Sequence, residues 1–360
     1  MGRLLHHCLP SAGGKDSQCT GHGERLMWAL ANKTPFAAER TWGRDLNGWH
    51  QWIVAVKATY NIQGDGVLEL ADEQCEPLFA GEYFGEPGQS SLKYEADLTP
   101  LKPTTDIIVN GTAHAPAGKP SNEFVVAMRV NNKQKALRIL GERHWEKGVV
   151  GLKPSTTQPV TRVPIRYEKA YGGWDKSQSN PAKQKWDPYN PVGCGLVQNE
   201  SQLGMPLPQI EHLERTAKRA GPAGFGAIDS FWHPRSQYVG TYDKQWQEQR
   251  HPLLPLDWQP QCLQCAPLDQ QTEKPLRGAE TIELFNLTPS GRLCFQLPKI
   301  YLTFTTHIAG RVEEHRAQMS SVIIEPDTMQ VKLIWNTELL CHNESDYLDR
   351  TIIRQKRYEQ

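Results

Sequence analysis

The sequence predicts a mainly β protein, with antiparallel sheets in a sandwich-like or barrel-like body, long ordered loops and a short C-terminal helix. Several stretches alternate apolar and polar residues with a period of two, the repeat of a half-buried strand. Gly (29 residues) and Pro (26 residues) divide the chain into short segments. Long stretches of helical periodicity are few. Short strands between turns rich in Gly and Pro are typical of sandwiches and barrels.

Three regions differ in character. Residues 1–26 are small, polar and without periodicity, so we expect an unstructured or spurious N-terminal extension before an alternative start at Met27. Residues 27–340 are predicted to form a single large domain, either undivided or split into two lobes by the loop at 172–222. Residues 341–360 are predicted to form a C-terminal helix and tail.

Strand signals begin at Met27, where WALANKTPF leads into a turn at Gly43–Gly48. The apolar segment 49–62, WHQWIVAVKATYNI, is predicted to be a long strand. A turn follows, and VLEL at 67–70 pairs back on it as a hairpin. A further strand is expected at 106–113. FVVAMRVNN and QKALRILGERHW should form a second hairpin around Asn131-Asn132.

The stretch 160–195 begins as a strand and continues as a loop. One face of VTRVPIRYEKAY is apolar and the other is charged, from the alternation of Val163, Ile165 and Tyr167 with Arg162, Arg166 and Glu168. Gly172-Gly173 ends the strand, because glycine adopts backbone angles that other residues rarely reach. The chain then stays irregular to about Pro222. Loops of this length are functional or disordered, and its tryptophans favour an ordered loop that docks on its own protein or on a partner.

Strands return in the C-terminal third. One helical turn is expected near 243–249. The predicted strands lie in the segments ETIELFNL, RLCFQLPKIYLTFTTHIAG, SSVIIEP and VKLIWN. The last segment, SDYLDRTIIRQKRYEQ, has helix signals. Ser345 is a good N-cap, Asp346 and Asp349 suit the first turn, and the end is basic.

Composition argues against several classes of protein. Lys+Arg and Asp+Glu both number 40, so no basic surface for nucleic acid is expected. No apolar run approaches the ~20 residues of a membrane span, and the N-terminus lacks the apolar core of a signal peptide. We therefore expect a cytoplasmic protein without membrane insertion, whose eight cysteines are reduced.

Signatures of catalysis are missing from the sequence, which carries no GxSxG, HExxH, GxGxxG or GxxxxGK[ST] motif. Cys262 and Cys265 have metal or redox spacing, but zinc needs a second pair of ligands. We therefore expect a protein that is not an enzyme, with no catalytic residues, cofactor or metal. The alternative is a hydrolase or carbohydrate-active enzyme with a carboxylate pair in the 94–106 or 166–175 region, and the candidate carboxylates are Glu95, Asp97, Asp106 and Glu168.

The aromatic residues of the loops have two interpretations. They fill seams of a β core, as most aromatic residues do, or they anchor a partner protein, because Trp, Tyr and Arg dominate binding energy at interfaces. On the second interpretation, the partner-binding face is built from the loop after Gly173 and from residues 225–258. Its candidate residues are Trp174, Trp186, Tyr189, Phe231, Trp232, Arg235 and Trp246.

Eleven motifs, in order from about Asn32 to Trp335, carry a resemblance to a known family. They are NKTPFAA, VAVKATYNI, GEYFGEPGQSSLKYEADLTPLKPTTDIIVNGTAHAPAGKP, LRILGERHW, TRVPIRYEKAYGG, NPVGCG, PLPQIE, PAGFGAI, YVGTYDKQW, APLDQQ and LRGAETIEL. Together they resemble the domain of unknown function found in bacterial type VI secretion gene clusters, whose members look like adaptors or chaperones for secreted toxins. The motif residues that match are Tyr94, Asp97, Lys102, Asp106, Arg166, Tyr167, Glu168, Asn190 and Gly193.

The resemblance implies a non-enzymatic adaptor. Such a protein binds a secreted toxin effector, often one with a PAAR-like spike-tip domain, and assists its loading onto the VgrG spike, either directly or through the effector. The sequence departs from the family at Cys262 and Cys265, where apolar residues or Asn are frequent. It also lacks the C-terminal pentapeptide repeats of some members.

Overall fold

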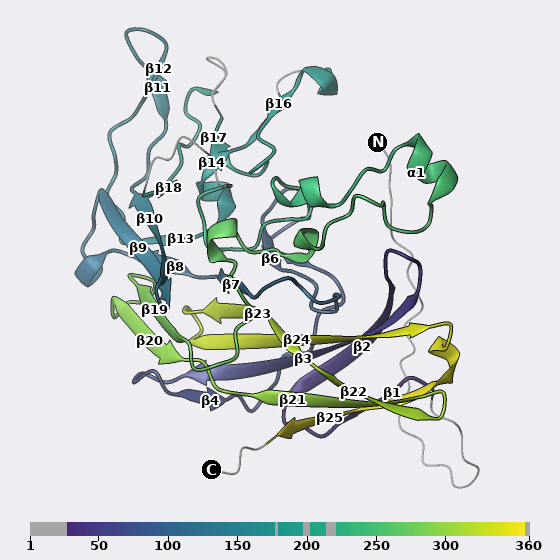
Figure 1. Cartoon of the computed structure of the whole chain (residues 1–360). Coiled ribbons are helices and arrows are strands. Elements are labelled where there is room, and N and C mark those ends of the chain that lie inside the picture. The colour runs from purple at the N-terminus through teal and green to yellow at the C-terminus, as the bar shows by residue number, and fades with distance from the viewer. Residues whose placement is uncertain (1–26, 177–178, 197–201, 214–220, 357–360) are drawn as a thin grey trace, which may run out of the picture.

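The computed structural model describes residues 27–176, 179–196, 202–213 and 221–356. The extension expected at 1–26 lies outside these residues, as do the last four residues of the tail. The described chain is mainly β, as the sequence predicts (Figure 1). Sheets fill the lower part of Figure 1, and loops with short two-stranded ribbons fill the upper part.

A central sheet of six strands forms one layer. Its order is β2 (Ala37–Arg44), β3 (His50–Ile62), β24 (Gln330–His342), β23 (Gln318–Glu325) and β7 (Asp106–Val109), with β4 (Leu68–Leu70) also paired to β3. β3 is the long apolar segment that the sequence predicts, and β24 pairs with it antiparallel along nearly its whole length. β4 forms the expected hairpin with β3. β7 joins the edge in parallel to β23.

Two sheets make up the second layer. A five-stranded sheet has the order β18 (Ile210–His212), β10 (Lys133–Leu140), β9 (Glu123–Val130), β19 (Thr281–Phe285) and β20 (Arg292–Gln296). A four-stranded sheet has the order β1 (Ala29–Asn32), β25 (Leu348–Lys356), β21 (Tyr301–Ile308) and β22 (Arg311–Arg316). The expected hairpin around Asn131-Asn132 joins β9 to β10.

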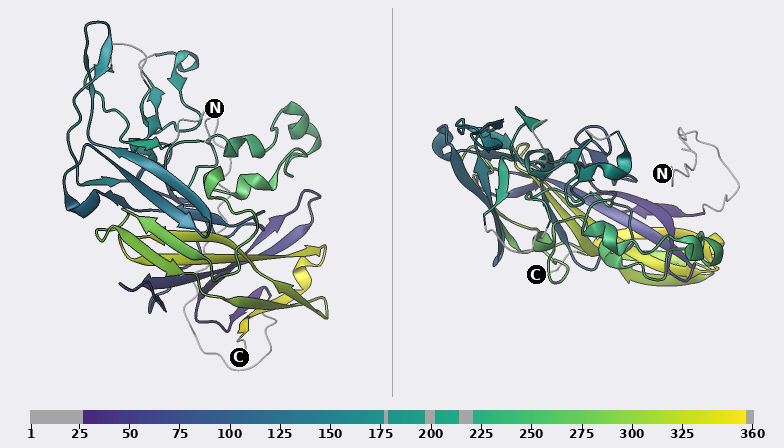
Figure 2. Two further views of the ribbon diagram at one scale, coloured as in Figure 1. Left: turned by 60° about the vertical axis from the view of Figure 1, so that its left-hand side comes forward. Right: turned by 90° about the horizontal axis from the view of Figure 1, so that it is seen from above.

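The main hydrophobic core lies between these layers (Figure 2). β3 contributes Val54, Val56 and Ala58, which alternate along one face of the strand and are fully buried. Phe304 of β21 and Leu137 of β10 belong to the same core cluster. In the part of the chain that the structure covers, the sheets keep open strand orders, so the sandwich-like form of the prediction describes the body.

Short elements connect the sheets. The ribbon strands are β5 (Glu82–Tyr83), β6 (Leu92–Tyr94), β8 (Thr112–His114), β11 (Trp145–Lys147), β12 (Leu152–Pro154), β13 (Arg162–Pro164), β14 (Tyr171–Gly172), β15 (Trp174–Asp175), β16 (Lys185–Trp186) and β17 (Cys194–Gly195). The 3-10 helices are η1 (Pro116–Gly118), η2 (Tyr167–Lys169), η3 (Pro181–Lys183), η5 (Arg235–Tyr238), η6 (Pro260–Leu263), η7 (Leu268–Gln270) and η8 (Ser345–Tyr347). The α-helix α1 (Lys244–Gln249) confirms the helical turn expected there. Asp243 caps it by accepting from the Trp246 backbone N–H at 2.8 Å.

The predicted C-terminal helix is wrong. Ser345 and Asp346 form only the turn η8, and β25 follows as a strand between β1 and β21. The β-branched run Thr351-Ile352-Ile353 favours a strand, and Thr351 and Ile353 are buried on the inner face of the sheet. Pairing with two neighbouring strands and burial in the core outweigh the local helix-cap signals.

The strand predicted at 160–171 is also shorter than expected. β13 covers Arg162–Pro164 alone, and Tyr167–Lys169 is the 3-10 turn η2. The predicted faces are nevertheless correct, because Val163, Ile165 and Tyr167 are all buried. The loop that follows pairs in short ribbons in its described parts, with β14 against β17 and β15 against β16.

His315 joins the two layers and predicts a pH dependence of stability. Its ring nitrogens lie 2.8 Å from Thr306 Oγ1 and 2.7 Å from Thr337 Oγ1, and the ring stacks on Phe304. Burial lowers the pKa of His315 from 6.5 to about 4. The unfolded chain therefore binds a proton at this residue at a higher pH than the folded chain, and folding loses stability as pH falls from about 6.5 towards 4.

Between pH 7 and pH 5, His315 alone should lower the free energy of unfolding by about 2 kcal/mol. Urea denaturation of the wild type and of His315→Gln at pH 7 and at pH 5 measures this loss of unfolding free energy. Other groups titrate alike in both proteins, so the loss should be about 2 kcal/mol smaller in the variant. An equal loss in both would mean that the histidine is not held neutral.

Candidate partner-binding surface and its buried polar support

Loops cover the second face of the central sheet. We call it the polar face, because buried lysine–carboxylate pairs lie on it beside a smaller apolar cluster that includes Ile108, Ile323 and Ile334. Lys57 lies in the middle of β3, and its Nζ is 2.7 Å from Asp97 Oδ2, with both side chains at most 5% exposed. Asp97 Oδ2 also accepts from the Leu78 backbone N–H at 2.9 Å. The pair therefore fixes the loop at 71–105 onto the sheet, because a buried charge is tolerated only when it is paired and hydrogen-bonded.

A second pair lies further along this face. Lys332 of β24 is paired with Glu325 of β23, and the Tyr94 hydroxyl donates to the same carboxylate. Lys332 Nζ lies 4.8 Å from the centre of the Tyr94 ring. Tyr94 therefore ties the covering loop to two strands of the sheet.

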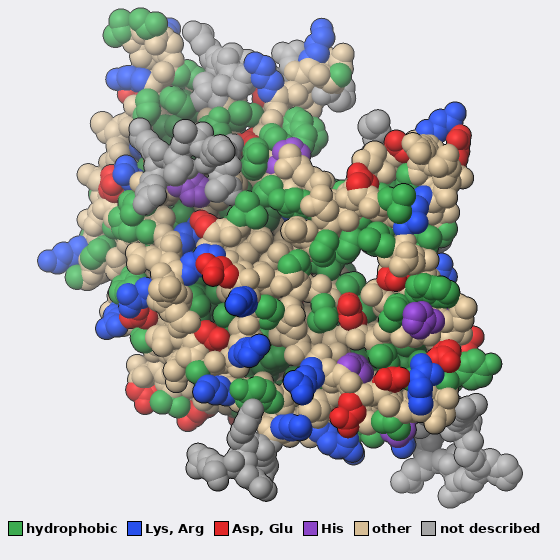
Figure 3. Space-filling view, in the orientation of Figure 1, with side chains coloured by type: hydrophobic (Ala, Val, Ile, Leu, Met, Phe, Trp, Pro, Cys, Tyr) green, Lys and Arg blue, Asp and Glu red, His purple; other side chains and the backbone are tan. Residues whose placement is uncertain are grey.

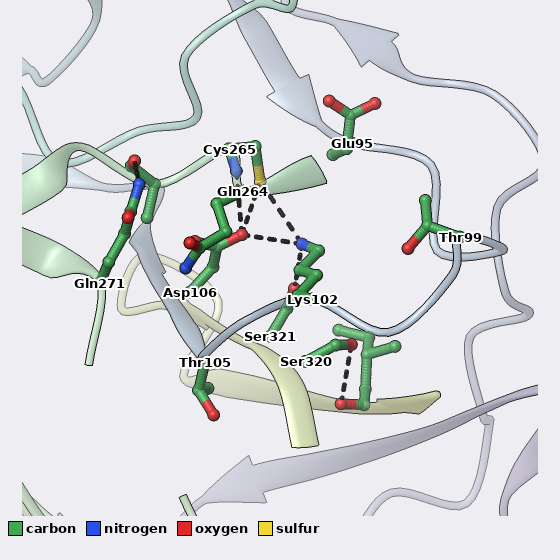
Figure 4. A network of polar contacts seen from close by, with 12 residues as sticks. Glu95, Thr99, Lys102, Thr105, Asp106, Gln264, Cys265, Gln271, Ser320 and Ser321 are labelled. Atoms are coloured by element: carbon green, nitrogen blue, oxygen red, sulfur yellow. Dashed lines mark hydrogen bonds and ion pairs between the residues drawn. The ribbon is translucent and has the colours of Figure 1, made fainter. Parts of the chain in front are cut away.

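The third pair is the most deeply buried and is shown in Figure 4. Lys102 Nζ donates to Asp106 Oδ2 at 2.8 Å and to Ser321 Oγ at 2.9 Å. Burial alone would lower the pKa of Lys102, but the Asp106 carboxylate raises it above its usual value. The Cys265 backbone N–H donates to the same carboxylate oxygen at 2.9 Å. The Lys102–Asp106 pair thus connects three parts of the chain, namely the loop at 71–105, β7 and the segment around Cys265.

The two cysteines with metal or redox spacing are buried parts of this support. Burial raises the pKa of the Cys265 thiol to about 12, so the thiol is protonated and a weak nucleophile. Cys262 and Cys265 are both free. In the described residues, no three His, Cys, Asp or Glu side chains come together in a group that could hold a metal ion.

Arg235, a candidate partner-binding residue, is buried instead of exposed. Its guanidinium is paired with Glu95 and donates to the backbone oxygens of Cys262 at 2.6 Å and of Ile228 at 3.0 Å. Its Nε and Nη1 donors are thus used within the chain. The guanidinium holds the 228–262 segment against the loop at 95, so Arg235 is part of the support and not of the exposed surface.

Trp232, another candidate partner-binding residue, is also buried in the structure. Only 4% of it is exposed, and its ring packs edge-on against Tyr167 with centroids 5.6 Å apart. The Tyr167 hydroxyl donates to the Gly226 backbone oxygen at 2.6 Å. These two rings, with Ile228, form a small separate core beneath the loops.

Asn190 and two glycines fix the loop that leaves this core. The Asn190 amide is fully buried and donates to the backbone oxygens of Tyr167 at 2.8 Å and of Tyr171 at 3.0 Å. A Cβ at Gly172, where φ is +154°, would lie 2.2 Å from the Asn190 backbone oxygen, and one at Gly193 would lie 2.4 Å from the Asn190 amide nitrogen. Only glycine fits at these close approaches.

Arg166 and Glu168 complete the connection between loops. The Arg166 guanidinium stacks over the Phe84 ring at 4.2 Å, and the Glu168 carboxylate accepts from Ser91 N at 2.8 Å and Ser91 Oγ at 2.7 Å. Every family-motif residue named from the sequence therefore packs or bonds within the chain. These residues position the loops above the sheet.

Three of the predicted partner-binding residues are exposed on this support. Trp174 and Trp186 lie opposite each other in the β15–β16 ribbon, with ring centroids 6.3 Å apart and exposed fractions of 47% and 49%. Phe231 is 79% exposed, next to the buried Trp232. We call Trp174, Trp186 and Phe231 the aromatic surface.

The last two candidate partner-binding residues, Tyr189 and Trp246, are neither fully buried nor mostly exposed. Tyr189 packs edge-on against His233. Trp246 of α1 packs on Tyr242, and its indole N–H donates to the Leu253 backbone oxygen at 2.8 Å. Both are partly exposed, and their contacts shape the segments on which they lie.

Sequence reasoning missed Lys57 and Lys332 as organising residues. Each stands alone in an apolar strand, in VAVKATY and VKLIW. A lysine at the centre of a buried strand requires a buried carboxylate, and this signal could have located the polar face.

A cavity of about 350 Å³ lies between the β9–β10 turn and residues 269–276. Lys135 is buried in its wall and donates to Asp269 Oδ1 and Gln270 Oε1, both at 2.8 Å. Burial lowers the pKa of Lys135. None of the predicted site residues lines this cavity.

Comparisons with known proteins identify one relationship. The family model described as an uncharacterized protein conserved in bacteria (DUF2169) matches residues 47–336, most of the chain. Neither the curated proteins nor the solved structures contain a match. In the part of the chain that the structure describes, no helix is long and apolar enough to cross a membrane.

Proposed function

We propose that this chain, which belongs to the DUF2169 family of proteins conserved in bacteria, is a non-enzymatic adaptor of a type VI secretion system. It binds a toxin effector in the cytoplasm, such as one carrying a PAAR-like domain, and assists its loading onto the VgrG spike. The sequence motifs support the link to secretion. The aromatic surface supports the binding of a protein.

The observation that carries the proposal is the exposed pair Trp174 and Trp186. Large aromatic side chains are mostly buried in a stable fold, and exposed ones on a rigid support are typical anchors at interfaces. The buried contacts of Asn190 and Gly172 hold the segment from which the ribbon extends. A pre-organised anchor loses less conformational freedom on binding, which favours affinity.

The carboxylates of the hydrolase alternative have internal partners. Asp97 and Asp106 are paired with buried lysines, Glu95 with Arg235, and Glu168 with Ser91. A pair that hydrolyses a substrate must face that substrate and a water molecule. These four carboxylates instead hold loops together inside the protein, which supports the adaptor function over the hydrolase alternative.

Co-expression tests the proposal. The full chain, tagged, is produced with the effector encoded beside it, and we expect the two to elute together in a fixed ratio. Purified chain should not turn over glycan or peptide substrates. Elution of the chain alone, together with a hydrolytic activity that Asp97→Asn abolishes in a folded variant, would contradict the adaptor and favour the hydrolase.

A further inference from the structure

The outer face of the four-stranded sheet carries a concentration of positive charge. In β21, Leu302, Phe304 and Ile308 point into the core, so the alternate residues point outward. The register places Arg354 and Arg316 on either side of Thr303, and Arg350 beside His307.

Two lysines extend this face. Lys356 lies opposite Tyr301 in the same register. Lys33 follows β1 directly, and its backbone N–H donates to the Ile353 oxygen at 2.9 Å, which places Lys33 beside Arg354. We call the five exposed residues the basic face. They are Lys33, Arg316, Arg350, Arg354 and Lys356.

The charge of the basic face is not balanced locally. The register places Glu314 on this face, opposite Thr305, and Asp349 lies beside Arg350 at the register shift of β25. Among the described residues, no ion pair joins the five cations to a carboxylate, whereas the nearby Arg311 is paired with Glu313 and Glu344. The whole chain is neutral, with 40 basic and 40 acidic residues. Five cations against Glu314 and Asp349 on this sheet therefore depart from the balanced charge of the whole molecule.

We propose that the basic face docks an acidic protein surface. Three of the five cations are arginines, whose planar guanidinium groups bind carboxylates in a bidentate geometry. Thr303 lies between Arg316 and Arg354, so these two arginines stand two strands apart on the same face. Clustered unpaired charges steer an oppositely charged partner and set its orientation.

Other occupants fit the chemistry less well. The unplaced residues 1–26 contain two acidic residues against three Lys and Arg, so they do not complement this face. A neutral chain does not favour nucleic acid. Membrane surfaces select cations together with large apolar side chains, and the large apolar side chain most exposed on this face is Val312.

The basic face lies far from the β15–β16 ribbon that carries Trp174 and Trp186. The four-stranded sheet is at the bottom of Figure 1, and the β16 label of the ribbon is at the top. Figure 3 shows Lys and Arg side chains along the lower part of the molecule, where β21 and β25 run in Figure 1. Two distant surfaces of different chemistry would allow one chain to hold two partners. The inference does not depend on the proposed function, because it concerns charge alone.

Binding of fluorescent poly-L-glutamate to the full chain tests the basic face at low salt. We expect saturable binding that weakens as salt rises. Arg316→Gln/Arg354→Gln should reduce affinity about tenfold. The matched control Lys147→Gln/Lys274→Gln removes the same charge from exposed lysines elsewhere and should leave affinity within about twofold.

Three outcomes would overturn the proposal. One is an equal loss in both double variants, which would indicate a general charge effect. Another is tighter binding to duplex DNA or to phosphatidylglycerol vesicles that only Arg316→Gln/Arg354→Gln weakens. The third is a salt-sensitive dimer in sedimentation that the same variant abolishes, which would make a second copy of the chain the occupant.

Discussion

Lys102→Met should lower the free energy of unfolding by about 3–5 kcal/mol, because it leaves the buried Asp106 carboxylate without a counter-charge. Asp106 is fully buried, and its Oδ2 would keep only the Cys265 N–H and thiol as donors. Its other oxygen, Oδ1, has no hydrogen-bond partner among the described atoms. The protein must then either keep an unpaired charge in its interior or protonate the carboxyl. Chemical denaturation at neutral pH measures the loss.

Two further variants separate charge from packing. In Lys102→Met/Asp106→Asn, the amide oxygen still accepts from the Cys265 N–H and no charge remains, so most of the lost stability should return. Lys244→Met removes the exposed partner of Glu248 in α1 and should change stability by less than about 0.5 kcal/mol. If Lys102→Met costs no more than Lys244→Met, the polar face is not what holds the loops.

Much of the fold follows from local patterns in the sequence. The apolar segment that becomes β3 and the Asn131-Asn132 turn between β9 and β10 carry signals within a few residues. The strand β25 has no such local signal. The residues before it favour a helix cap, whereas its pairing with β1 and β21 joins segments far apart in the sequence. The shortened strand β13 has the same cause, since Tyr167 turns into a core shared with Trp232.

The candidate site was only partly predictable for a similar reason. Trp174, Trp186 and Trp232 lie in loops of similar composition, and nothing local distinguishes an exposed tryptophan from a buried one. Trp232 is buried because it meets Tyr167, far away in the chain. Arg235 is buried because Glu95 reaches it from another loop.

Truncation of the exposed tryptophans should weaken effector binding and leave the fold intact. Each of Trp174→Ala and Trp186→Ala should cost about 2 kcal/mol of binding free energy or more, as anchors at interfaces do. Because each is about half exposed, neither removal opens a cavity in a core. Phe79→Ala, which removes a side chain 66% exposed elsewhere on the surface, should leave the affinity unchanged.

Trp232→Ala should show the opposite behaviour. Its side chain fills the small core with Tyr167 and Ile228, so its removal should cost about 3–5 kcal/mol of stability. At a temperature where the variant is still folded, effector affinity should remain near that of the wild type.

Calorimetric titration of the purified effector into the wild type, Trp186→Ala and Trp232→Ala tests the central claim, that the aromatic surface holds the cargo. We expect binding about thirtyfold weaker for Trp186→Ala with an unchanged melting temperature, and near wild-type affinity with a lower melting temperature for Trp232→Ala. Full affinity in folded Trp174→Ala/Trp186→Ala would contradict the account and place the cargo elsewhere on the molecule.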